Sequence, residues 1–270
     1  MRRIARAVVD GASHHGEVED RTFHVLTGDV FGRPTRTGRA LSLDEVSLLA
    51  PFDGVRFINV MGGFNPPDAP PPPMPPMWLP KAVAFASGDG GRIEVPSVLT
   101  GPVQLESELA VVVGRPLRKA TPELAREAIF GWTIFNDVTA AEYGPGGFWA
   151  VGKSIDGFAS WGPWVRTDLS EARVMEGLSI GATLNGVEVQ SGNTKHFRFP
   201  PSEVISHVSH RISLNPGDVV TLGTPPPAVD VAIGDHSVCI VEEIGELHNV
   251  YVAEGAALVE GRASVVVGAS

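Results

Sequence analysis

The stretch Glu106-Ser107-Glu108-Leu109-Ala110-Val111-Val112-Val113-Gly114 places two carboxylates directly before an unbroken apolar run. Such a run, ended by a glycine, is typical of a buried strand. Side chains two residues apart in a strand point to the same face and lie about 6–7 Å apart. Two unpaired anions beside a core are costly, and a hard divalent cation with oxygen ligands relieves that cost. The pattern alone also fits two surface glutamates, so it leaves the metal site open.

Further strands are predicted on both sides of this stretch. Phe130–Asp137 is predicted as a second buried strand, and its polar end supplies a third carboxylate, Asp137. Asn185-Gly186 is the typical two-residue turn of a β-hairpin, and Thr121-Pro122 is a typical helix start. The sequence therefore predicts a mostly β fold with few helices, in the α+β class. The other predicted elements are strands at Arg21–Leu26, Val55–Val60, Val219–Leu222, Ser237–Ile244 and Ala263–Val267, and a helix at Ser202–Ile212.

Glycine (31 residues) and proline (23 residues) make up one residue in five of the 270-residue chain. This composition favours short strands joined by turns over long helices. We predict a small N-terminal sheet domain at residues 1–50 and the main domain at residues 51–270. Nine prolines lie between positions 66 and 80. Because proline lacks the backbone donor, no strand or helix is expected to run through Asn65–Pro76, and we interpret residues 65–80 as a stiff loop or lid.

The charge balance and the cysteine count exclude several classes of protein. The net charge of −10 offers no basic surface for DNA or RNA, so no nucleic-acid partner is expected. The single cysteine, Cys239, excludes an internal disulfide and fits a reducing compartment. The apolar run Leu109–Val113 is too short to span a bilayer, and no signal peptide is evident. We therefore expect a cytoplasmic protein that does not bind membranes.

Several short motifs occur in an order that resembles the fumarylacetoacetate hydrolase family, and together they cover nearly the whole chain. Each motif is weak alone, but the ordered set is specific. The resemblance implies the family fold, a mixed β-sandwich or β-roll core with a small N-terminal sheet domain, and a homodimer. The motifs are Glu106–Val112, Trp132–Ala140, Gly152–Phe158, Leu184–Gln190, Leu214–Val220, Leu222–Pro225 and Ile244–Asn249.

The resemblance also implies a site. It implies that three carboxylates bind one Mg²⁺ or Mn²⁺ and that Lys153, beside the metal, offsets negative charge on a substrate oxygen. The substrate would be a small 2-oxo acid or an acylpyruvate-like β-dicarbonyl compound, and the metal would stabilise its enolate. The implied metal ligands are Glu106, Glu108 and Asp137, and the implied substrate-binding residues are Thr224, Gly223, Gln190 and Asn59.

The sequence departs from the family pattern at two places. Family hydrolases carry Asn-Tyr-x-x-His-x-x-Glu, whose histidine and glutamate activate water. Here Asn59 aligns, but Gly63 stands at the histidine position and Pro66 at the glutamate position. An arginine that commonly follows the Asp137 motif is replaced by Ala141. The metal carboxylates are therefore retained while the water-activating pair is lost.

Three interpretations remain open at this stage. The first is a divalent-metal enzyme that cleaves a C–C bond, by hydrolysis or decarboxylation, or acts as an isomerase, hydratase or dehydratase of a 2-oxo acid. Loss of the water-activating pair disfavours hydrolysis among these. The second is a non-catalytic protein that binds an oxo acid. The third is an interaction module built on the proline-rich segment.

Overall fold

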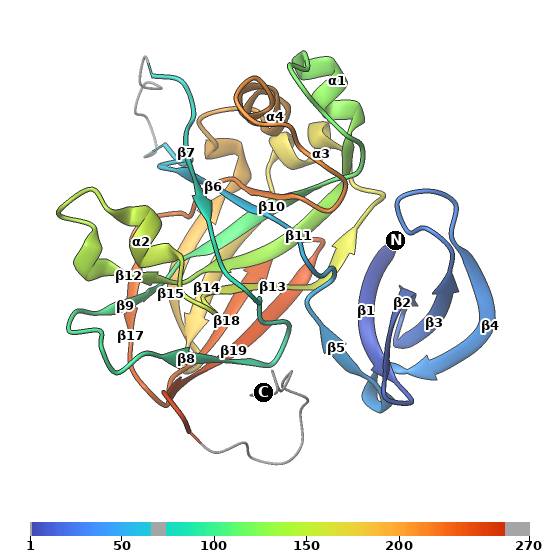
Figure 1. The fold of residues 1–270 in the computed structure, drawn as a ribbon, viewed down its shortest axis with the longest axis horizontal. Coiled ribbons are helices and arrows are strands. Elements are labelled where there is room, and N and C mark those ends of the chain that lie inside the picture. Colours follow the sequence, from blue (N-terminus) through green and yellow to red (C-terminus); the bar gives the residue numbers. More distant parts are fainter. Residues whose placement is uncertain (1, 66–73, 257–270) are drawn as a thin grey trace.

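The computed structural model describes residues 2–65 and 74–256. Strands dominate this part of the chain, and its α-helices are short (Figure 1). The prediction of a mostly β fold with few helices is therefore confirmed. The strand predicted at Ala263–Val267 lies outside the described residues, as does the proline-rich stretch 66–73. No helix in the described ranges is long and apolar enough to cross a membrane.

The largest sheet has 11 strands and runs from the N-terminal unit into the main domain. Its central strands, β10 and β11, pair antiparallel, with Ser107 opposite Asn136. Its order is β4 (Thr35–Ser42), β3 (Thr22–Thr27), β2 (Ala12–Glu19), β1 (Arg3–Val9), β13 (Ala159–Arg166), β11 (Ile129–Asp137), β10 (Ser107–Val113), β16 (Val219–Thr221), β6 (Phe57–Met61) and β7 (Met77–Lys81), while β5 (Ser47–Leu49) pairs with β1.

Two smaller sheets complete the main domain. The five-stranded sheet packs on one face of β10 and β11, where Val111 and Trp132 share a hydrophobic cluster with Ile180 and Leu247. The sheet order is β15 (Val187–Asn193), β14 (Ser179–Leu184), β18 (His236–Val241), β19 (Gly245–Ala253) and β8 (Gly91–Val95), and the three-stranded sheet is β12 (Thr139–Ala140), β9 (Val103–Leu105) and β17 (Val229–Val231).

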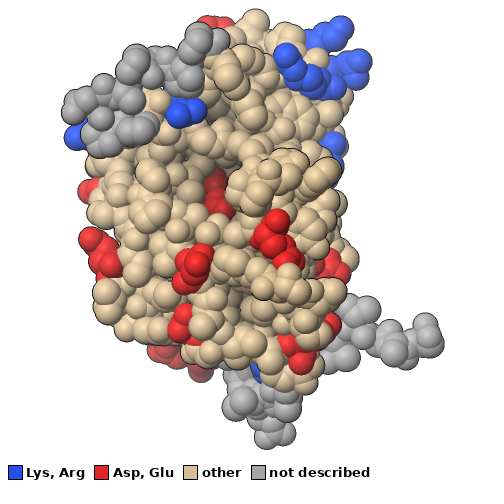
Figure 2. Space-filling model, turned by 90° about the vertical axis from the view of Figure 1, so that its left-hand side faces the viewer, with Lys and Arg blue, Asp and Glu red and all other residues tan. Residues whose placement is uncertain are grey.

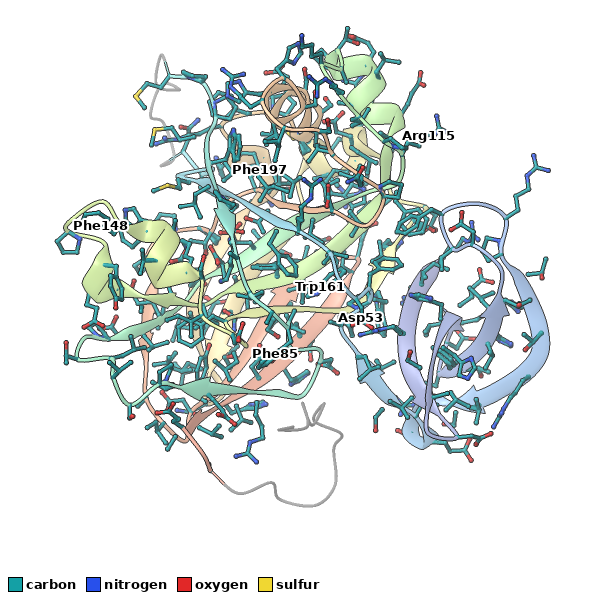
Figure 3. The ribbon with its side chains drawn as sticks, viewed as in Figure 1. Asp53, Phe85, Arg115, Phe148, Trp161 and Phe197 are labelled. Carbon is teal, nitrogen blue, oxygen red and sulfur yellow. The ribbon has the colours of Figure 1, made fainter. Side chains whose placement is uncertain are left out.

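Both faces of the central strands are buried. Along β10, Leu109, Val111 and Val113 contact the cluster beneath the five-stranded sheet. Ala110 and Val112 face a second cluster that contains Trp161. Figure 3 shows Trp161 inside these layers, whereas Phe148 lies at the outer edge beside α2 (Trp149–Lys153). A strand that is buried on both faces explains why the sequence shows an unbroken apolar run rather than an alternating one.

The N-terminal strands form a unit with its own small core, set to one side of the molecule in Figure 1. Ala5, Val18 and Phe23 are buried in this core. The unit is joined to the main domain through β1 and β13, where Arg3 pairs with Arg166. The domain boundary at residue 50 stays a prediction, because the sheet is continuous across the two units.

The turn and helix-start predictions agree with the structure. Asn185 and Gly186 both have positive φ angles of 52° and 81°, as a type I′ turn requires. The Thr121 side chain accepts a hydrogen bond from the Leu124 amide and begins α1 (Pro122–Glu127). The helix predicted at Ser202–Ile212 is shorter, since α4 runs from Pro201 to Ser209. The remaining α-helix, α3, spans Glu171–Glu176.

One strand prediction and one loop prediction need correction. The strand predicted at Ser237–Ile244 ends at Val241 in β18, because Glu243 and Gly245 have positive φ angles and turn the chain into β19. Residues 77–80 were expected to belong to a loop or lid, but they lie in β7. Pro80 is tolerated there because β7 ends the path of the sheet and has one neighbour, β6.

Candidate metal centre

Three carboxylates converge where β10 and β11 lie side by side. Glu108 is in β10, Asp137 is the last residue of β11, and Glu106 lies between β9 and β10 rather than within the strand. One oxygen from each of the three carboxylates lies within 4.8 Å of the other two. Glu108 and Asp137 are only 2% and 1% exposed. Three converging oxygen donors suit a hard divalent cation.

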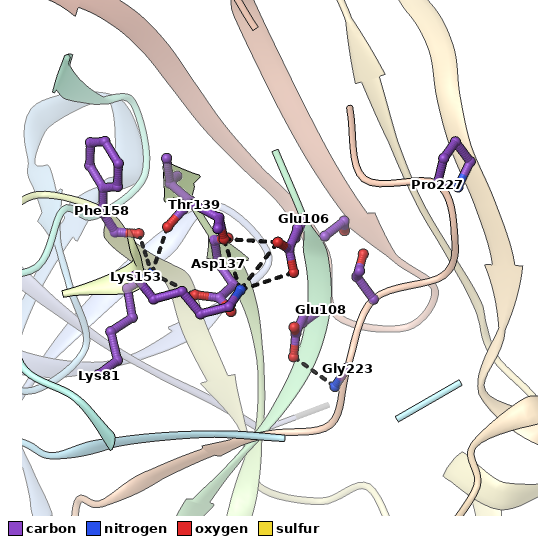
Figure 4. A network of polar contacts seen from close by, with 12 residues as sticks. Lys81, Glu106, Glu108, Asp137, Thr139, Lys153, Phe158, Gly223 and Pro227 are labelled. Carbon is purple, nitrogen blue, oxygen red and sulfur yellow. Dashed lines mark hydrogen bonds and ion pairs between the residues drawn. The ribbon is translucent and has the colours of Figure 1, made fainter. Parts of the chain in front are cut away.

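Lys153, at the end of α2, binds two of these carboxylates (Figure 4). Its Nζ atom lies 2.5 Å from Asp137 Oδ2 and 3.2 Å and 3.1 Å from the two oxygens of Glu106. It also lies 2.8 Å from Thr139 Oγ1, and that hydroxyl donates to Glu106 Oε1. The structure therefore brings the predicted lysine and the predicted metal ligands into one cluster.

A second lysine, which the sequence analysis missed, lies on the other side of Asp137. Lys81 is the last residue of β7, and its side chain is fully buried. Its Nζ atom donates to Asp137 Oδ1 at 2.5 Å and to the main-chain oxygens of Val138 and Phe158 at 3.0 Å and 2.9 Å. Thr139 was also missed as a member of the cluster, although it lies within one of the family-like motifs.

Burial and the close charges set unusual pKa values in this cluster. Burial, reinforced by the Asp137 charge, raises the pKa of Glu108 to about 8, and burial also raises the pKa of Glu106. Burial acts on Asp137 in the same direction, but the Lys153 and Lys81 ammoniums outweigh it and hold that pKa at about 2. Burial opposes the charge on Lys153, yet the Asp137 and Glu106 carboxylates raise its pKa above the usual value. The two glutamates therefore lie where added positive charge would be favourable.

The loop after β16 closes over Glu108. The Gly223 amide donates to Glu108 Oε2 at 2.7 Å. Gln190 holds this loop, since its Nε2 donates to Thr224 Oγ1 at 3.0 Å and to the Pro225 and Pro227 oxygens at 2.9 Å and 2.7 Å. Gln190 Oε1 accepts from the Ser107 amide at 2.9 Å. The amide of Gln190 is therefore occupied by protein groups, and its predicted contact with substrate stays a prediction.

Asn59 is buried in β6 at 1% exposure. Within the described ranges, neither polar atom of its side chain has a hydrogen-bond partner. The register of β6 and β16 pairs Ile58 with Val220, so Asn59 lies beside Thr221. The roles predicted for Asn59, Gly223 and Thr224 in substrate binding stay predictions.

Gly63 stands where family hydrolases carry histidine, and it has no room for a side chain. A Cβ atom on Gly63 would lie 1.8 Å from the Leu222 carbonyl oxygen. All eight histidines of the chain lie in the described ranges, and none shares a hydrogen bond or ion pair with the three carboxylates or Lys153. A side chain at position 63 would therefore require the Leu222 carbonyl to move, and the loss of the water-activating pair stays a prediction.

Figure 2 shows the side of the molecule that lies at the left of Figure 1, where α2 is located. Acidic side chains are spread over the middle of this face, and one acidic group is visible inside a hollow. The side chains of Glu106 and Lys153 are 13% and 6% exposed. The carboxylate cluster is thus mostly enclosed, with Glu106 as its most accessible carboxylate.

Family models match both parts of the chain. The model for the fumarylacetoacetate (FAA) hydrolase C-terminal domain matches residues 55–252, and the model "Rv2993c-like, N-terminal" matches residues 2–51. Protein Rv2993c of Mycobacterium tuberculosis is 32% identical over 263 residues, covering 93% of this chain and 95% of that protein.

Solved structures share the fold over most of the chain. The 2-hydroxyhepta-2,4-diene-1,7-dioate isomerase from Mycobacterium marinum has a TM-score of 0.86 and 28% identity, covering 94% of this chain and 100% of that one. The maleylpyruvate hydrolase from Sphingobium sp. SYK-6, in complex with manganese(II) and pyruvate, has a TM-score of 0.77 and 20% identity, covering 93% and 99%. The family model spans the strands that carry the carboxylates, and the predicted motifs lie within it. This chain belongs to the fumarylacetoacetate hydrolase family.

Proposed function

We propose that this protein is a divalent-metal-dependent enzyme that acts on a small 2-oxo acid or β-dicarbonyl compound through an enolate. The observation that carries the proposal is the convergence of Glu106, Glu108 and Asp137 within 4.8 Å, beside the buried ammonium of Lys153. The donor set fits Mg²⁺ or Mn²⁺, because all three ligands are carboxylates. Manganese and pyruvate in the structure of maleylpyruvate hydrolase, which shares this fold, support the same proposal.

The three carboxylates and Lys153 have different roles in this proposal. Glu106, Glu108 and Asp137 would hold the cation, which supplies Lewis acidity toward an enolate oxygen when it is bound. In the metal-free protein the carboxylates around Lys153 raise its pKa, and as an ammonium it would offset negative charge on a substrate oxygen. The buried surroundings strengthen this interaction, since charges interact more strongly where water is excluded.

We propose that the reaction is C–C bond cleavage by decarboxylation rather than hydrolysis. Decarboxylation of a β-oxo acid needs a stabilised enolate but no activated water. In the described residues, no histidine hydrogen-bonds or ion-pairs with the three carboxylates or Lys153, and Gly63 has no space for a side chain. Hydrolysis would require another base in this position.

Enol–keto isomerisation is the second candidate reaction. The Mycobacterium marinum structure, which is 28% identical to this chain, is named as an isomerase of a hydroxy-diene dioate. Isomerisation also proceeds through an enolate and needs no attack by water. Hydration or dehydration of a 2-oxo acid and binding without turnover remain the alternatives.

A metal-supplemented substrate panel tests these reactions together. Acylpyruvates, oxaloacetate and 2-oxo-3-deoxy acids would be incubated with the protein and Mn²⁺ and followed by mass and by NMR. Decarboxylation gives loss of carbon dioxide, isomerisation gives a new NMR spectrum at unchanged mass, and hydrolysis gives gain of water with fragmentation. The matched control is Glu108→Gln, which keeps the size of the side chain but removes its charge. If no substrate changes, the interpretation as a non-catalytic oxo-acid-binding protein is favoured. Turnover by Glu108→Gln equal to that of wild type would contradict a metal-dependent enzyme.

We also propose a homodimer, as the family resemblance implies, and a cytoplasmic location, which fits the single cysteine of the chain. Light scattering coupled to size-exclusion chromatography measures the assembly directly. A mass equal to one chain at micromolar concentration would contradict the dimer.

A further inference from the structure

The contacts of Lys81 favour a positive charge on its buried side chain. Its Nζ atom has three acceptors: one oxygen of Asp137 and the main-chain oxygens of Val138 and Phe158. A neutral amine has only two N–H groups, whereas an ammonium has three. Burial lowers the pKa of Lys81 and the Asp137 carboxylate opposes that shift, but three acceptors at hydrogen-bond distance favour the ammonium form. The Phe135 ring, with its centroid 5.6 Å from Nζ, also favours a cation.

Lys81 cannot contact a substrate directly. Its side chain is fully buried, and all three of its protons are used within the protein. It acts instead on Asp137, whose two oxygens are divided between the two lysines. Lys81 binds Oδ1 and Lys153 binds Oδ2. Lys81 thereby fixes the orientation of a proposed metal ligand from β7, a strand that is distant in sequence.

The charges of the cluster leave a defined balance. Three carboxylates and two ammoniums give a net charge of −1 when all are ionised. In the described residues, the hydrogen bonds and ion pairs of these groups involve no further charged side chain. A divalent cation changes the net charge to +1. One singly negative chelating ligand then brings the net charge of the site to zero. Without the Lys81 charge the cluster would have a net charge of −2, and the divalent cation alone would neutralise it.

We propose that Lys81 is a positioning residue that makes the site selective for an anionic chelating ligand, such as a 2-oxo carboxylate. This inference rests on the proposed metal-dependent function. The Lys81 charge weakens the hold on the bare cation, because it repels the cation and shares the charge of Asp137. The same charge strengthens binding of the anion that completes the site. Lys81 therefore makes cation and substrate anion bind as a pair rather than separately.

The test compares wild type with Lys81→Met and Lys81→Gln. The glutamine variant keeps two N–H donors for the buried oxygens but carries no charge. Lys119→Met removes an exposed lysine beyond the far end of β10 and controls for overall charge. Mn²⁺ affinity is measured by electron paramagnetic resonance. Pyruvate and its neutral analogue pyruvamide are then titrated onto the Mn²⁺-loaded proteins by calorimetry.

We expect both Lys81 variants to bind Mn²⁺ about tenfold more tightly than wild type and pyruvate about tenfold more weakly. The ratio of pyruvate to pyruvamide affinity falls toward one in the variants and is unchanged in Lys119→Met. If Lys81 had a merely structural role, the variants would bind pyruvate and pyruvamide more weakly by the same factor, and the ratio of the two affinities would be unchanged.

Several results would overturn the inference. An unchanged pyruvate-to-pyruvamide ratio, or weaker Mn²⁺ binding in a folded Lys81→Gln variant, contradicts it while leaving the proposed function intact. If neither variant folds, wild type alone still decides, because equal affinity for pyruvate and pyruvamide contradicts selectivity for an anion. Failure of wild type to bind Mn²⁺ refutes the proposed function, and this inference with it.

Discussion

Glu108 offers a direct link between the carboxylate cluster and the stability of the protein. In the absence of a cation its pKa is raised to about 8 from an ordinary 4.5, mainly by burial. A carboxyl with a raised pKa holds its proton more tightly in the folded protein than in the unfolded chain. Its contribution to stability is therefore complete below pH 4.5 and is lost as the pH rises through 8.

The size of the effect follows from the pKa difference. At ~1.4 kcal/mol for each pH unit, the metal-free protein loses about 3 kcal/mol between pH 4.5 and pH 7 through this one group. For a chain of this size that loss lowers Tm by roughly 6–12 °C. Glu108→Gln cannot ionise, so the variant lacks this part of the pH dependence. We expect a divalent cation to stabilise the wild type by mass action, most strongly at pH 8, where Glu108 is more fully ionised.

The assay is calorimetric unfolding of chelator-treated wild type and Glu108→Gln from pH 5 to pH 8, with and without Mn²⁺. The quantity that matters is the difference between the two proteins at each pH, because other titrating groups are common to both. Wild type is expected to lose stability relative to the variant as pH rises and to regain it with Mn²⁺. Parallel pH profiles, or equal stabilisation of both proteins by Mn²⁺, would refute the reasoning about Glu108.

Three further substitutions have defined outcomes. Lys153→Met should reduce kcat at least ~100-fold while Mn²⁺ stays bound, because the ammonium acts on the substrate oxygen; steady-state kinetics with metal analysis measures this, and unchanged kcat would count against the assigned role. Gly63→Ala should lower the free energy of unfolding by ~1–3 kcal/mol in urea, because its Cβ would lie 1.8 Å from the Leu222 oxygen; wild-type stability would show that the chain can move there. Gln190→Leu should lower the free energy of unfolding by about 1–3 kcal/mol, since it leaves the buried Ser107 main-chain amide without its acceptor. Hydrogen exchange should also speed up at the Gly223 and Thr224 amides, and unchanged exchange would show that the loop is held by other contacts.

The central strands could be predicted from the sequence because their signals are local, whereas the carboxylate cluster was implied by the family resemblance. The run Leu109–Val113 is buried on both faces and so is apolar at every position. The Asn185-Gly186 turn and the Thr121 cap depend on single residues with strong backbone preferences. The motifs around Glu106 and Asp137 predicted that these residues meet, although Glu106 lies just outside β10.

Lys81 could not be predicted because its role depends on contacts distant in sequence. It follows a proline-rich segment, where a lysine is expected to be solvated. It is buried because β7 pairs with β6, with Lys81 opposite Phe57, and because Val138 and Phe158 present their main-chain oxygens to it. The engaged amide of Gln190 is a similar case, since its partners lie 34 to 37 residues further along the chain and in the Ser107 strand.

The proposed metal centre is tested most directly by locating the metal. Crystals grown with Mn²⁺ and measured at the manganese absorption edge give an anomalous difference map that identifies the ion without reference to activity. One peak per chain is expected between the carboxylates of Glu106, Glu108 and Asp137, and crystals of Glu108→Gln should lose it. A map from Mn²⁺-saturated wild-type crystals with no peak among these carboxylates, or with its peak elsewhere, would contradict the metal centre on which the proposed function depends.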